Sequence, residues 1–183
     1  MSLDARLAEL VDRHEIHQVL LRYARGLDRL DNALARSCYW DDAIDDHGHF
    51  VGKADDFIPW ADQTTLMFES TQHAVMNHFC DLQGDEAFCE TYYQFSGVTA
   101  EGPNFVSTGR YIDHLQKRAG KDGPEWRIAN RVTIVEGTYD VPKAAQAPSP
   151  MTAYSTEEPC QATRDGNDVS YHRPPVPRWP RAG

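Results

Sequence analysis

The stretch TQHAVMNHFCDL, residues 71–82, decides the fold, because its apolar residues recur with a period of two. This alternation predicts a β-strand whose side chains point to two opposite faces. One face carries His73, Val75, Asn77 and Phe79, and the other carries Ala74, Met76, His78 and Cys80. Before this stretch the apolar spacing is mostly helical, so the predicted secondary structure changes from helix to strand near residue 71.

Three further strands are expected after residue 82. They cover residues 87–99, 105–117 and 126–139. Short segments rich in Gly, Pro, Asn and Asp separate them, and these residue types favour turns. Long consecutive strands joined by short loops predict an antiparallel meander.

The sequence before residue 71 is expected to be mainly helical. A long helix is predicted over residues 2–31, a short one over 32–39 and a third over 53–69. Between them, residues 43–51 indicate a short strand or hairpin that turns at Gly48. Helices first and strands afterwards predict an α+β fold rather than an alternating α/β fold.

An aspartate lies on the expected core-facing side of the first helix. That side carries Leu7, Val11, His14, Leu21 and Ala24 at helical spacing, and Asp28 continues it. A carboxylate placed there loses hydration unless a partner compensates it. His73 can supply the compensation, and an Asp–His pair beside an apolar cavity can transfer protons. The alternative is structural, with Asp28 capping a helix end and His73 bonded to a carbonyl in the core.

Composition and charge exclude several classes of function. The chain has 183 residues and a net charge of −10, which argues against nucleic acid or an anionic membrane as a partner. No apolar run approaches the roughly 20 residues that a membrane-spanning helix needs. The N-terminus is not expected to be a signal peptide. The four cysteines have no metal-finger spacing, so we expect free thiols in the cytoplasm.

The end of the chain differs from the rest. Proline is frequent after residue 141, and the apolar periodicity is lost. We therefore expect one domain over residues 1–140 and an extended tail over residues 141–183. Disorder, docking on the same domain and docking on a neighbouring subunit are all compatible with this tail.

Several short motifs, in their order and spacing, resemble the SnoaL-like branch of the nuclear-transport-factor-2-like (NTF2-like) superfamily. The resemblance covers about residues 5 to 140. The motifs are residues 22–28 (RYARGLD), 39–43 (YWDDA), 71–77 (TQHAVMN), 84–87 (GDEA), 109–113 (GRYID) and 126–129 (WRIA).

The resemblance implies a cone-shaped, highly curved antiparallel sheet packed by N-terminal helices, the NTF2-like or cystatin-like α+β barrel. It also implies a hydrophobic small molecule in the cone, no cofactor, and a homodimer or homotrimer. The Asp–His pair of the family's dehydratases and dehydrochlorinases falls on Asp28 and His73. A tyrosine five positions before the aspartate falls on Tyr23. Five helical residues turn about 140°, so Tyr23 is either a proton donor at the flank of the cavity or an ordinary core aromatic.

Five residues are candidates for substrate binding: Asn77, Arg110, Arg131, Tyr93 and Trp40. An arginine that faces the cavity would hold a carboxylate or enolate, whereas one on the outer face would be solvated or pair with Glu. Asn77 could bond a substrate carbonyl if it shares the face of His73. Tyr93 and Trp40 belong to a large set of aromatic residues, some of which should line the cavity.

The run Asp45-Asp46-His47-Gly48-His49 contains residue types that bind zinc or iron. No clear further ligand completes the set, so we expect a plain loop and no metal.

The function that these observations predict is a cofactor-independent lyase. His73, oriented by Asp28, would remove a proton from an aromatic or polycyclic substrate, followed by dehydration or another elimination. Retro-aldol cleavage of a C–C bond uses the same base. The alternatives are a non-catalytic binding module and the small subunit of a ring-hydroxylating oxygenase, to which the same resemblance extends.

Overall fold

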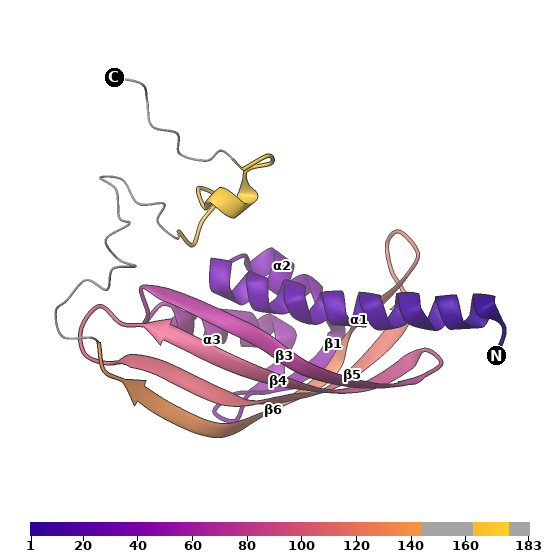
Figure 1. Cartoon of the computed structure of the whole chain (residues 1–183), viewed down its shortest axis with the longest axis horizontal. Coiled ribbons are helices and arrows are strands. Elements are labelled where there is room, and N and C mark those ends of the chain that lie inside the picture. Colours follow the sequence, from indigo (N-terminus) through magenta and orange to yellow (C-terminus); the bar gives the residue numbers. More distant parts are fainter. Residues whose placement is uncertain (144–162, 176–183) are drawn as a thin grey trace.

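The computed structural model describes residues 1–143 and 163–175 (Figure 1). Three helices precede the main strands, as the sequence predicts. The elements are α1 (Leu3–Arg29), α2 (Asn32–Ser37), β1 (Tyr39–Asp46), β2 (Val51–Lys53), α3 (Ala54–Thr65), β3 (Ser70–Gln83), β4 (Glu86–Val98), β5 (Asn104–Ala119), β6 (Pro124–Val141) and the 3-10 turn η2 (Val169–Tyr171).

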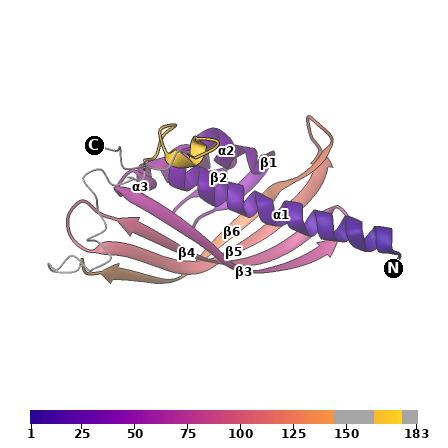
Figure 2. The same ribbon diagram turned by 45° about the horizontal axis from the view of Figure 1, so that its top comes forward.

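The strands form one curved six-stranded sheet in the order β2-β1-β6-β5-β4-β3. The helices lie on its concave side (Figures 1 and 2). Strands β3 to β6 form the predicted antiparallel meander, and the α+β class is confirmed. However, β1 pairs with β6 in parallel, so the sheet is mixed and open instead of antiparallel throughout. Parallel pairing is possible here because a long connection, through α3 and the meander, separates the two strands.

The buried side of α1 differs from the predicted one. Leu7 and Val11 are exposed, because the N-terminal part of α1 extends beyond the sheet (Figure 1). The face that packs on the sheet lies further along the helix. It consists of Ile16, Val19, Leu20, Tyr23, Ala24, Leu27 and Asp28. Asp28 therefore does lie on the core side, as expected, although Leu21 and His14 do not.

A β-bulge in β3 changes which side chains face the core. The register with β4 shifts between Val75 and His78, so one extra residue is inserted there. His73 faces inward before the bulge, and His78 faces inward after it. The prediction that Asn77 shares the face of His73 is therefore wrong, and Asn77 is exposed.

The described part of the tail contacts the domain of the same chain. The Arg29 guanidinium pairs with Asp168 at 3.3 Å, and the Tyr171 hydroxyl donates to Asp31 at 3.2 Å. Nη1 of Arg164 donates to two backbone carbonyls, those of Thr65 at 2.9 Å and Phe68 at 3.0 Å. Segment 163–175 is thus fixed against the C-terminal end of α1 and the loop that follows α3. In the described part of the chain, no helix is both long and apolar enough to cross a bilayer.

Candidate active site

A cavity of about 530 Å³ lies between the concave face of the sheet and the helices. Its wall is mainly aromatic and aliphatic. The apolar lining includes Leu27, Phe57, Trp60, Phe68, Tyr93, Phe95, Phe105 and Tyr111. Three histidines, His47, His49 and His73, also line it, and no lysine or arginine does so among the described residues. Such a cavity suits an uncharged, hydrophobic small molecule.

The predicted Asp28–His73 pair lies at this wall. One carboxylate oxygen of Asp28 is 2.7 Å from Nδ1 of His73, and the other accepts the backbone N–H of His73 at 2.8 Å. Because a carboxylate only accepts, Nδ1 must donate the proton of this bond, and in a neutral imidazole Nε2 then keeps the free lone pair. Burial by itself raises the pKa of Asp28, but the bonds from His73 outweigh it and hold that pKa below its ordinary value.

A second histidine of the cavity wall, His47, is also paired with an aspartate, and sequence reasoning missed this pair. Nδ1 of His47 lies 2.6 Å from the fully buried carboxylate of Asp45. The other oxygen of Asp45 accepts the hydroxyl of Tyr39 at 2.6 Å. Burial, reinforced by Asp45, raises the pKa of Tyr39 well above its ordinary value, so the phenol keeps its proton and donates it. The run considered as a metal loop therefore places His47 and His49 in the cavity wall, with Asp45 buried behind His47.

Tyr23 packs beside this wall without lining the cavity. Its ring contacts those of Tyr39, Phe57 and Tyr111, and it is 1% exposed. Its hydroxyl is buried without a hydrogen-bond partner in the described structure, and burial raises its pKa. This arrangement fits the core-aromatic alternative better than direct contact with a ligand.

Arg131 forms a buried ion pair and does not reach the cavity. Its guanidinium donates to both oxygens of Asp113, at 2.6 and 2.8 Å, and both side chains are fully buried. The same guanidinium lies 4.1 Å from the ring centroid of Tyr23 and 4.2 Å from that of Tyr111. The prediction of a ligand contact is wrong for Arg131, because its side chain is fully buried and does not line the cavity.

The structure also corrects the placement of Arg110 and Trp40. Arg110 pairs with Glu90 at 3.1 Å and Glu136 at 2.7 Å, as the outer-face alternative expects. Trp40 donates its indole N–H to the carbonyl of Gln116 and packs against two arginines away from the cavity. Like Asn77, neither side chain lines the cavity. Tyr93 does line it, with its ring stacked 4.5 Å from that of Tyr111.

The side chains with metal-ligand spacing in the described residues are His78, Cys80 and Cys89, and they lie outside the cavity. The predicted free thiols agree with the structure at Cys38, Cys80 and Cys89. Cys160 lies outside the described residues.

Comparison with known proteins agrees with this fold. The family described as SnoaL-like domain matches residues 8–132. A solved protein from Kribbella flavida is 20% identical with a TM-score of 0.64, over 72% of this chain and 95% of that one. A putative scytalone dehydratase from Novosphingobium aromaticivorans is 20% identical with a TM-score of 0.64, over 75% of this chain and 92% of that one. A hexachlorocyclohexane dehydrochlorinase from Novosphingobium barchaimii is 18% identical with a TM-score of 0.60, over 81% of this chain and 99% of that one. No curated protein matches the chain.

Proposed function

Because the chain belongs to the SnoaL-like domain family, we propose that it is a cofactor-independent lyase that acts on a hydrophobic cyclic molecule. One observation carries the proposal: a histidine held by a buried carboxylate opens onto an apolar cavity. The named dehydratase and dehydrochlorinase among the similar structures are consistent with an elimination. A cavity that only stored a ligand would have no need of this pair.

In the proposed reaction, Nε2 of His73 removes a proton from the substrate. Asp28 stabilises the imidazolium that forms, because its carboxylate already accepts the Nδ1 proton at 2.7 Å. Positioned general-base catalysis of this kind contributes about 10²–10⁴-fold to the rate. The same base acting on a substrate hydroxyl would begin a retro-aldol cleavage.

His47 is the proposed proton donor to the leaving group. When hydroxide leaves, it must take a proton, and a protonated His47 supplies it while Asp45 stabilises the charged ring before transfer. For each turnover the C–H proton goes to His73, the C–O bond breaks, and the His47 proton completes the water. Solvent then takes up the proton from His73 and supplies a new proton to His47.

The cavity favours an uncharged substrate with a flat or cyclic skeleton. Aromatic rings form much of its wall, and the described lining includes no lysine or arginine that would compensate a phosphate or carboxylate. The hydroxyl-bearing residues Tyr93 and Ser107 also line it and can donate to a carbonyl whose neighbouring carbon loses the proton.

The test compares turnover of scytalone and of hexachlorocyclohexane by the purified chain and by the His73→Gln variant, with products followed by mass spectrometry. We expect elimination of water or chloride from at least one of them, and a loss of about 100-fold or more in the variant. His14→Gln, at an exposed position of α1 outside the cavity, is the control and should retain activity. Equal turnover by the His73→Gln variant would exclude the proposed base, and tight binding without turnover would favour the binding module.

We also propose that the chain forms a homo-oligomer through the outer face of the sheet. Four apolar side chains line a shallow groove there: Phe79, Phe88, Ile112 and Val132. Phe79 is 69% exposed, which is unusual for so large an apolar side chain without a covering partner.

A further inference from the structure

Strands β3 and β4 bring two cysteines to directly opposite positions. Cys80 pairs with Cys89 in the antiparallel register, and His78 pairs with Thr91 one inward position away. The bulge after Val75 is what turns His78 and Cys80 toward α1, onto the side where Cys89 is buried. Three residues that bind transition metals thus meet, although they come from two different strands.

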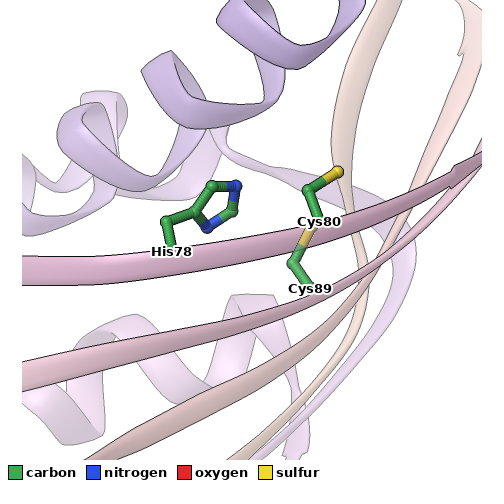
Figure 3. A group of neighbouring side chains, drawn as sticks. All are labelled: His78, Cys80 and Cys89. Atoms are coloured by element: carbon green, nitrogen blue, oxygen red, sulfur yellow. The ribbon is translucent and has the colours of Figure 1, made fainter.

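The potential ligand atoms of His78, Cys80 and Cys89 all lie within 4.8 Å of one another. Figure 3 shows one nitrogen of the His78 ring on the side that faces Cys80, with Cys89 rising from the adjacent strand. With Zn–S bonds near 2.3 Å and Zn–N bonds near 2.1 Å, tetrahedral ligand atoms lie roughly 3.5–3.8 Å apart. A contraction of at most about 1.3 Å, by side-chain rotation, would therefore close the three ligands around an ion.

The hydrogen bonds of His78 leave one nitrogen without a partner. Nδ1 lies 2.9 Å from the hydroxyl of Thr91, which is fully buried. Nε2 is also buried and has no hydrogen-bond partner in the described structure. A buried polar atom without a partner costs free energy unless a ligand satisfies it. The Thr91 contact is the kind of outer bond that orients a metal-bound histidine.

We propose that His78, Cys80 and Cys89 bind one zinc ion. Two thiolates and an imidazole suit zinc, and the two thiolate charges neutralise the divalent cation in this half-buried place. Binding releases two thiol protons to solvent. Nη1 of Arg13, which donates to the Cys80 carbonyl at 2.7 Å, adds a positive charge that favours the thiolates.

The fourth position is open to water or to His17. The ring centroid of His17, on α1, lies 5.5 Å from that of His78. With His17 as a ligand, the ion would tie α1 to both β3 and β4. None of these residues lines the cavity, so the zinc would be structural, and the proposal does not depend on the proposed function.

A disulfide between Cys80 and Cys89 is the competing use of the same pair. It needs an oxidant, and it leaves Nε2 of His78 without a partner. A zinc ion would give Nε2 of His78 a partner and would also use both cysteine thiols, so the observations favour zinc over a disulfide.

The test uses the full chain, purified in the presence of a thiol reductant and then loaded with zinc or cobalt. We expect one zinc per chain by mass spectrometry. Cobalt should give the thiolate-to-cobalt charge-transfer band and the visible bands of a tetrahedral site. Cys80→Ser and Cys89→Ser should lose the stoichiometric ion, and Thr91→Val should bind it about 10–100-fold more weakly.

Cys38→Ala, which removes a buried cysteine outside the cluster, is the control and should still bind one ion. Two results would overturn the proposal: reduced wild-type chain without a cobalt–thiolate spectrum, or unchanged zinc content in Cys80→Ser and Cys89→Ser. A Cys80–Cys89 disulfide in chain that binds no metal after reduction would assign the pair to oxidation instead. If a cysteine variant does not fold, the cobalt spectrum and the zinc content of the wild-type chain still test whether the metal site exists.

Discussion

Replacing Asp28 by asparagine keeps the shape of the side chain and removes its charge. In the wild type the carboxylate accepts two bonds from His73, one from the backbone N–H and one from Nδ1. An amide has one acceptor and one donor group. The introduced amide would therefore accept from the backbone N–H and donate to Nδ1, which forces the ring proton onto Nε2. The base that faces the cavity would be lost, although the histidine stays in place.

The expected loss of stability follows from the two hydrogen bonds that Asp28 accepts from His73. Hydrogen bonds to a charged group contribute about 1.5–3 kcal/mol each, and neutral ones about 0.5–1.5 kcal/mol. The exchange of two charged bonds for two neutral ones should lower the free energy of unfolding by about 2 kcal/mol at pH 7. Turnover should fall by about 10²–10⁴-fold, the usual contribution of a general base.

The stability difference between wild type and Asp28→Asn should also depend on pH. Because the folded pKa of Asp28 lies below its ordinary value of 3.8, the unfolded chain binds the proton more readily. The extra stability is present above that ordinary value and is lost as pH falls through the folded pKa. Urea unfolding of both proteins between pH 7 and pH 2.5 measures this, with Asp122→Asn as the control.

Asp122 is an exposed carboxylate in the turn between β5 and β6, so its replacement should change stability by less than about 0.5 kcal/mol. A difference between wild type and Asp28→Asn that stays constant across this pH range would refute the reasoning. So would an Asp28→Asn variant as stable and as active as the wild type at pH 7.

Three further predictions concern other parts of the molecule. His47→Gln should slow the loss of water more than the loss of halide, because only hydroxide needs a proton to leave; equal effects on both substrates would contradict its role as the acid. Asp113→Asn should destabilise the chain by about 3–5 kcal/mol in urea unfolding, because it leaves Arg131 buried without its carboxylate. Phe79→Glu should lower the mass measured by sedimentation to that of a monomer, and an unchanged oligomer would place the interface elsewhere.

The regular parts of the fold were predictable from local patterns. Alternation and turn residues indicated the strands of the meander, and the helix-first order indicated the α+β class. The pairing of Asp28 with His73 was predictable through the resemblance, since the two residues belong to distant elements. The parallel pairing of β1 with β6 has no local signal, because it depends on how the whole sheet is assembled.

The inaccurate predictions have specific physical causes. A bulge inserts one residue in β3, and single-sequence alternation does not reveal it, so Asn77 was assigned to the wrong face. His47 was treated as part of a loop because Gly48 follows it, although Asp45 lies on a strand with its side chain inward. The Cys80–Cys89 pairing did have a signal: a two-residue turn at Gly84-Asp85 places these positions opposite each other.

The tail segment contacts the rim of the cavity. Arg164 holds the carbonyls of Thr65 and Phe68, and the side chains of these two residues line the cavity. A chain that ended at residue 143 would keep both Asp–His pairs but lose this brace on the rim. We therefore expect removal of the tail to change how fast a ligand exchanges, and to leave the proposed proton transfers at the two Asp–His pairs unchanged.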